Sequence, residues 1–94
     1  MVKLYKEVLI VININSNTSL IELFEIVKGT LEELEKDEVF VVKELFRGFE
    51  WNRIAKGNRT KLGSIFLKFS KNEGTKIIVG IEKTLQNQYK YRKL

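Results

Sequence analysis

The 94-residue sequence contains no cysteine and no histidine, and it has no long apolar run. Without cysteine there can be no disulfide and no thiolate metal site, and without histidine the commonest general base and metal ligand are missing. No stretch approaches the ~20 apolar residues of a membrane span, and the apolar run at 8–12 is too short for a signal peptide. We therefore expect a soluble, cytoplasmic protein that binds no cofactor or metal and has no membrane partner.

The acidic residues and the glycines do not form an enzymatic pattern either. A nuclease or polymerase needs a carboxylate cluster for Mg²⁺, but residues 47–94 contain only three acids, Glu50, Glu73 and Glu82, each far from the others in sequence. The glycines form neither a P-loop nor a dinucleotide fingerprint. We therefore predict that the protein is not an enzyme.

Charge is divided unevenly between the two halves of the sequence. Residues 1–46 contain five lysines and nine acids, a net charge of −4, whereas residues 47–94 contain twelve cations and three acids, a net charge of +9. A small basic protein can show such a bias by chance. A strongly basic half nevertheless favours a polyanionic partner, and nucleic acid is the commonest one.

The hydrophobic pattern predicts a single domain over residues 1–94, because no proline, linker or repeat interrupts it. Residues 2–15 alternate in a way that predicts a strand, with an inward face formed by Val8, Ile10, Ile12 and Ile14. Ser19 and Glu22 fit a capping box, and the helix that they begin should continue to about residue 36.

The second half of the sequence alternates short helical segments with strands. Asn58 is placed to cap a basic helix, whose apolar side would be formed by Leu62, Ile65, Phe66 and Phe69. A hairpin follows, with Ile77, Val79 and Ile81 predicted to point inward. The segments expected after the first helix are a short strand at 38–42, helical turns at 43–46 and 50–54, the basic helix after 58, and two hairpin strands around a tip at 84–88.

This order of elements is that of an α+β, winged helix-turn-helix-like domain with an added N-terminal strand and a C-terminal β-hairpin wing. In such a domain the helix before the hairpin is the recognition helix, and the hairpin is the wing. Both elements are basic here, so the cations lie on the two surfaces that would face DNA. The pattern therefore predicts a nucleic-acid-binding protein.

Cations and aromatic residues concentrate in two places. The first surrounds the start of the basic helix, where free backbone N–H groups and the helix dipole favour phosphate. The second, at 89–92, alternates tyrosines with cations, which suits single strands because rings stack on unpaired bases while cations follow the backbone. Tyr89, Tyr91 and Trp51 have core packing as an alternative role. The candidate nucleic-acid-binding residues are Arg53, Lys56, Arg59, Lys61, Lys68, Lys71, Lys83, Tyr89, Lys90, Tyr91 and Arg92.

The exposed side of the basic helix indicates that the protein binds nucleic acid without selecting a particular base sequence. Arginine, asparagine or glutamine usually reads base edges in a major groove, whereas this helix offers Lys61, Ser64, Lys68 and Lys71. Lysine contacts phosphate as a point charge and reads little sequence. This surface is therefore better suited to holding a backbone than to reading bases.

Part of the sequence resembles a known family. The stretches LFRGFEWNRIAKGNRTKLGSIF (45–66) and KTLQNQYKY (83–91) are similar to small proteins carried on staphylococcal cassette chromosome elements and related mobile elements, long catalogued as a domain of unknown function. The resemblance spans about residues 42–91, and residues 1–37 carry none of its pattern. The matching positions are Leu45, Phe46, Glu50, Trp51, Gly57, Arg59, Leu62, Gly63, Lys83, Thr84, Asn87, Gln88 and Tyr91.

The resemblance implies a winged-helix-like protein that binds single-stranded DNA without the five-stranded barrel usual in such proteins. It also implies a setting in replication of the mobile element, with an element-encoded helicase or polymerase as partner. Non-sequence-specific binding of single-stranded DNA is therefore the leading hypothesis. A double-stranded DNA-binding transcriptional regulator, expected as a homodimer paired through the N-terminal strand, is the alternative. A protein-interaction module, whose acidic first helix docks on a basic partner, is a third.

Overall fold

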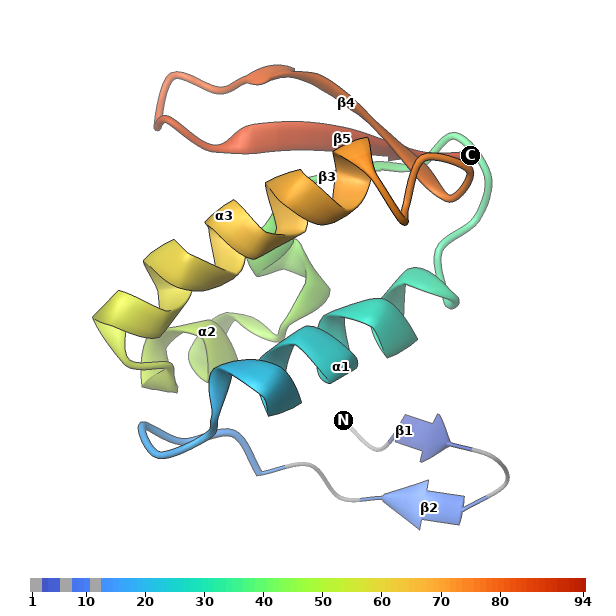
Figure 1. The fold of residues 1–94 in the computed structure, drawn as a ribbon. Coiled ribbons are helices and arrows are strands. Elements are labelled where there is room, and N and C mark those ends of the chain that lie inside the picture. The colour runs from blue at the N-terminus through green and yellow to red at the C-terminus, as the bar shows by residue number, and fades with distance from the viewer. Residues whose placement is uncertain (1–2, 6–7, 11–12) are drawn as a thin grey trace.

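A computed structural model of the chain describes residues 3–5, 8–10 and 13–94 (Figure 1). The chain folds into mixed helix and sheet, which agrees with the predicted α+β class. None of the helices in these ranges is long and apolar enough to cross a membrane. The elements in chain order are β1 (Lys3–Tyr5), β2 (Val8–Ile10), α1 (Leu20–Leu31), β3 (Val39–Phe40), the short 3₁₀ helix η1 (Val42–Leu45), α2 (Gly48–Arg53), α3 (Lys56–Lys71), β4 (Ile78–Lys83) and β5 (Tyr89–Lys93).

The helices pack on one side of an antiparallel sheet with the order β3-β5-β4, and α3 lies between the hairpin and α1 (Figure 1). An aromatic cluster joins helix to sheet at the centre of the core. The Tyr91 ring of β5 stacks on Phe40 of β3 at 5.8 Å and meets the edge of Phe66 of α3 at 4.8 Å, both between ring centroids. Such pairs add to the burial of apolar area. The core therefore depends on one strand, β5, that contacts both sheet neighbours and α3.

The start of α1 is as predicted, but its end is not. The Ser19 hydroxyl accepts the Glu22 N–H at 3.2 Å, and the Glu22 carboxylate accepts the Ser19 N–H at 3.1 Å, which completes the capping box. The helix ends at Leu31 instead of continuing to about residue 36. The Thr30 hydroxyl donates to the Ile26 carbonyl, and the chain then tightens into turns that keep Leu34 packed against the core.

The predicted cap of the basic helix is wrong. Helix α3 begins at Lys56 and not after Asn58, so the stretch KGN (56–58) forms its first turn. Ala55 occupies the cap position without a side-chain hydrogen bond. The Asn58 side chain instead donates to the Thr18 carbonyl at 3.4 Å, which links α3 to the turn before α1. The buried Ile54 fixes this two-residue connection between α2 and α3, and tertiary packing therefore decides where the helix begins.

The N-terminal segment is two strands rather than the single strand predicted over 2–15. Strands β1 and β2 pair antiparallel, with Lys3 opposite Ile10, and they form a separate two-stranded sheet. Of the predicted inward face, Ile14 is buried. The predicted inward positions of Val8, Ile10 and Ile12 lie outside the described side chains.

The hairpin has the predicted order but the opposite face of β4 is buried. Ile78 is buried, whereas Ile77, Val79 and Ile81 are 39%, 36% and 47% exposed. The reason is Tyr91, whose ring projects inward across from Gly80 and would lie 3.8 Å from a Cβ there. Ile78 precedes Gly80 by two residues and therefore shares the inward side of β4 with it, whereas Ile77, Val79 and Ile81 lie on the other side.

Gly74→Ala should destabilise the domain, because the added Cβ would lie 2.5 Å from Cε2 of the buried Phe69 ring. The Gly74 N–H also donates to the Phe69 carbonyl at 2.7 Å, which ties the backbone to the same residue. Overpacking of this kind costs ~1–3 kcal/mol, and urea unfolding would measure the loss. Gly57→Ala is the matched control, since no atom lies within 4 Å of its new carbon. Equal losses in the two variants would contradict the steric explanation.

Candidate nucleic-acid interface

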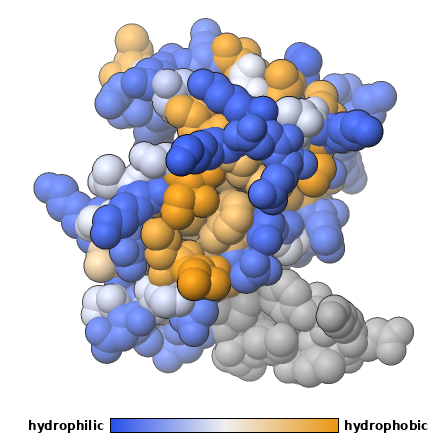
Figure 2. All heavy atoms as spheres, in the orientation of Figure 1, coloured by the Kyte–Doolittle hydropathy of each residue, from blue (hydrophilic) through white to orange (hydrophobic). Residues whose placement is uncertain are grey.

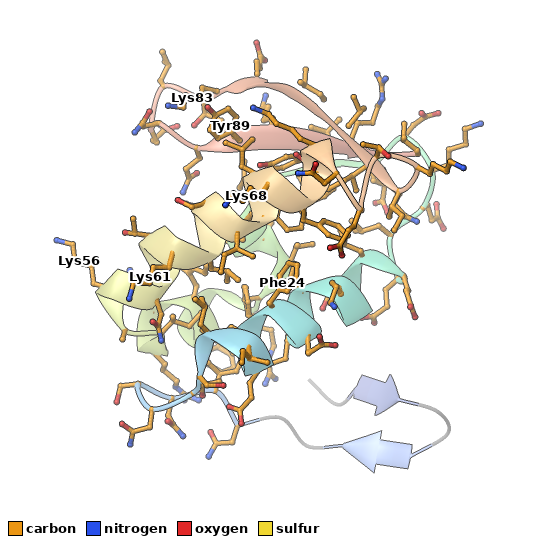
Figure 3. All side chains as sticks on the ribbon, in the orientation of Figure 1. Phe24, Lys56, Lys61, Lys68, Lys83 and Tyr89 are labelled. Carbon is orange, nitrogen blue, oxygen red and sulfur yellow. The ribbon has the colours of Figure 1, made fainter. Side chains whose placement is uncertain are left out.

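A groove of about 410 Å³ lies between the N-terminal half of α3 and the tip of the β4–β5 hairpin. Its volume falls within the ~300–1,000 Å³ typical of small-ligand sites. Figure 3 shows Lys83 and Tyr89 of the hairpin beside α3. The groove is lined by Arg59, Thr60, Gly63, Ser64 and Leu67 of α3, by Lys83, Asn87, Gln88, Tyr89 and Tyr91 of the hairpin, and by Val42, Lys43 and Trp51 from η1 and α2.

One side of α3 forms the helical wall of this groove. Arg59, Gly63 and Leu67 are spaced four residues apart, so they follow one side of the helix. Gly63 has no side chain to narrow the groove at its middle. Arg59 is half-buried, and its Nε is buried without a hydrogen-bond partner among the described residues. An arginine held in this way retains donors for an incoming acceptor such as a phosphate oxygen.

The hairpin tip is a fixed turn that positions the opposite wall. The Thr84 N–H donates to the Gln88 carbonyl at 2.6 Å, and the Thr84 hydroxyl accepts the Gln88 N–H at 3.2 Å. Asn87 closes the turn with φ 63°, a left-handed conformation that asparagine adopts more readily than most residues. The two polar residues Thr84 and Asn87 therefore build the turn, and its hydrogen bonds hold the flanking Lys83 and Gln88 at the groove.

A β-bulge brings Lys83 to the side of the hairpin that faces α3. The register shifts between Gly80 and Lys83, so Lys83 pairs with Tyr89. Its Nζ lies 5.0 Å from the centroid of the Tyr89 ring, a cation–π contact. Tyr89 is 38% exposed, so part of its ring remains open to solvent. Cation and ring together present what an unpaired nucleotide requires: a charge for the phosphate and a face for the base.

Tyr91 does not fit the predicted stacking role. It is 1% exposed and packs between Phe40 and Phe66, so its ring faces are covered by the core. The pKa of Tyr91 is raised to about 12, chiefly by burial and also by the neighbouring Tyr89, against the lowering effect of a hydrogen bond with Ser70. Tyr91 therefore lines the bottom of the groove and anchors β5, the strand that also holds Tyr89. It presents no ring face on which a base could stack.

The other predicted cations lie outside the groove. Lys68 borders a separate hollow between α1 and α3, next to Phe24 and Ile65, and Lys61 lies two turns earlier on the same side of the helix. Figure 2 shows apolar side chains gathered over the middle of this face, with hydrophilic ones around them. Lys56 is exposed at the start of α3 and points away from it (Figure 3).

The remaining candidates are divided between two further surfaces. Lys71 borders a hollow between α3 and β4. Side chains alternate along β5, so Lys90 and Arg92 face away from the side shared by Tyr89 and Tyr91. The Lys90 Nζ lies 3.9 Å from a carboxylate oxygen of Glu82, and this ion pair partly offsets the positive charge of Lys90. The structure therefore brings together Arg59, Lys83 and Tyr89, and it spreads the other predicted residues around the molecule.

Sequence reasoning missed several residues of the interface. Lys43 enters the groove from η1, which is distant in sequence from the two basic clusters. Trp51 packs on the core, with its ring 5.7 Å from that of Phe46, and it also lines the groove, so base stacking stays a prediction for this residue. Asn87 and Gln88 were placed only in the hairpin tip. The family resemblance could have identified Asn87 and Gln88, because most of the polar and aromatic residues that match the family line this groove or build the hairpin turn.

The molecule is thus a small α+β domain in which a helix and a hairpin enclose a groove that is both basic and aromatic. The chain belongs to the family described as Domain of unknown function (DUF1413), whose family model matches residues 25–93. This agrees with the expected membership of a family of unknown function. The match begins within α1, however, so the prediction that residues 1–37 carry none of the pattern is wrong. No curated protein and no solved structure matches the chain.

Proposed function

We propose that the protein binds single-stranded DNA without sequence preference. The groove between α3 and the hairpin carries this proposal, because it combines Arg59, Lys43 and Lys83 with the rings of Tyr89 and Trp51. Cations that track a backbone and rings that accept unpaired bases are the two components of sequence-tolerant single-strand binding.

The shape of the groove favours a single strand over a duplex. A hollow of about 410 Å³ between a helix and a hairpin tip is the size of a small-ligand site, so it suits an unstacked nucleotide. Bases in a duplex are stacked on each other and cannot present a face to Tyr89 or Trp51 without being extruded. Stacking on an aromatic side chain contributes ~1–3 kcal/mol per base.

We also propose that the fold is a winged helix-turn-helix-like domain. The order α1, β3, α2, α3 and hairpin, and the sheet order β3-β5-β4, support this assignment. The fold keeps the alternative function in consideration, since α3 would be the recognition helix of a double-stranded DNA regulator. Lys61 and Lys68 on its exposed side favour that candidate, although lysines grip phosphates and read little sequence.

The biological setting is a further part of the proposal and depends on the resemblance. Replication of a mobile genetic element requires single strands to be covered while a helicase and a polymerase act. We propose this cytoplasmic setting, with an element-encoded helicase or polymerase as partner. The basic charge of residues 47–94 supports a polyanionic ligand.

Matched single- and double-stranded oligonucleotides of one sequence test the proposal. We expect tighter binding of the single strand, and an affinity that falls steeply with salt because counterions are released from the DNA. Gel shifts or fluorescence anisotropy at two salt concentrations measure both properties. A scrambled single strand of the same length is the control and should bind equally well. Equal or tighter binding of the duplex would overturn the proposal in favour of the double-stranded alternative.

A further inference from the structure

An exposed aromatic residue on α2 lies between two arginines, away from the features that define the groove. Phe49 is 48% exposed, although it is one of the large apolar residues of the chain. The guanidinium carbon of Arg47 lies 4.6 Å from the centroid of its ring, and that of Arg53 lies 4.9 Å from the same centroid. Both distances are within the ~6 Å range of cation–π contacts. We call these three residues the Arg–Phe–Arg cluster.

The cluster is held in place by the start of α2. Glu50 is buried, and its carboxylate accepts the Arg47 backbone N–H and the Arg47 Nη2–H, each at 2.9 Å. Arg47 therefore has a fixed position and a neutralising partner. Arg53 is exposed, and one turn of helix places it next to Phe49. A rigid cation–aromatic pair beside a second, solvent-accessible guanidinium loses little conformational entropy when a planar ligand binds.

We propose that the Arg–Phe–Arg cluster is a second nucleotide-binding site for the same single strand; the inference rests on the proposed function. The ligand is one nucleotide of single-stranded DNA. Its base would stack on the cluster, because unpaired bases stack on aromatic rings and on guanidinium planes. Its phosphate would be bound by Arg53, whose planar group donates two parallel hydrogen bonds to phosphate oxygens.

The two sites lie on different sides of α2, and this predicts a dependence on strand length. Trp51 lines the groove, and Phe49 precedes it by two residues, a rotation of about 200° around the helix axis. A strand confined to the groove therefore cannot also contact the cluster. A longer strand that passes around α2 can contact both sites. The second site should thus contribute to the binding of long oligonucleotides and not to the binding of short ones.

Phe49→Ala tests this inference with two labelled oligothymidylates, of about six and about twenty nucleotides. We expect Phe49→Ala to bind the long strand about five- to tenfold more weakly than the unaltered protein does, because the stacking of one base is lost. Its affinity for the short strand should be unchanged. Arg53→Gln should give the same selective loss and a smaller salt dependence for the long strand. Ile21→Ala, at an apolar position on the acidic α1 that is even more exposed than Phe49, is the matched control and should change neither.

Two results would overturn the second site. The first is an equal loss, or no loss, at both lengths for Phe49→Ala, with Trp51 fluorescence showing the variant folded. The second is an unaltered protein that binds the long strand no more tightly than the short one. If the unaltered protein binds neither strand, the proposed function itself fails and this site with it. That outcome is distinct, because a functional groove without a second site still binds the short strand.

Discussion

Arg59→Glu combined with Lys83→Glu is expected to weaken the binding of single-stranded DNA by at least ~100-fold at low salt. The two substitutions replace cations on opposite walls of the groove by carboxylates, and these repel the phosphates that the cations would attract. The slope of log affinity against log salt should also fall by about 1.4, because two phosphate contacts are lost and each contributes ~0.7 for a single strand. Fluorescence anisotropy over a series of salt concentrations measures both effects.

The matched control for this double substitution is Lys61→Glu combined with Lys68→Glu. It changes the net charge by the same amount, but at two positions on the side of α3 that faces away from the groove. We expect a loss of about tenfold or less, from the general weakening of the positive field. If the control pair weakens binding as much as the groove pair, the groove is not the binding site, and the exposed side of α3 becomes the better candidate.

The second large effect is a loss of stability in alkali. The pKa of Tyr91 is raised to about 12 in the folded protein, chiefly by burial, whereas an exposed tyrosine in the unfolded chain titrates near ~10. The folded state therefore holds this proton more tightly than the unfolded state. The stabilising contribution is fully present below about pH 10 and is lost as the pH rises towards about 12. The loss amounts to roughly 3 kcal/mol.

Urea unfolding of the unaltered protein and of Tyr91→Phe, each at about pH 9 and about pH 12, isolates this contribution. All other titratable groups are common to both proteins, so the difference between their two pH dependences is due to Tyr91. The variant should lose less stability between the two pH values than the unaltered protein. Parallel losses would mean that Tyr91 ionises as an exposed tyrosine does and is not held in the core as described.

Features of the fold that depend only on neighbouring residues could be predicted from the sequence. The start of α1 is an example, since Ser19 and Glu22 form the capping box among themselves. The face of β4 could not be predicted in this way. Its sequence offers two apolar sides, and alternation alone favours the one with Ile77, Val79 and Ile81. The Tyr91 ring on the neighbouring strand projects into the core opposite Gly80, so the side of β4 that carries Ile78 and Gly80 is the one turned inward.

The candidate site was predicted as a set of residues and not as an arrangement. Arg59, Lys83 and Tyr89 were all identified, yet nothing local indicates that they share a groove. Two features of the tertiary structure bring them together: the packing of α3 against the sheet, and the bulge that turns Lys83 towards Tyr89. The same packing places Lys61 and Lys68 elsewhere, so charge and spacing alone could not separate the two groups.

The position of β5 in the sheet has a consequence for biosynthesis. It is the last element of the described chain and also the central strand, so β3 and β4 have no hydrogen-bonded neighbour in this sheet before it arrives. In a nascent chain that has not yet released residues 89–93 from the ribosome, Phe40 of β3 and Phe66 of α3 lack the Tyr91 ring that packs against both of them. Domains fold as units once their long-range contacts can form. The three-stranded sheet therefore cannot be completed until residues 89–93 have left the ribosome.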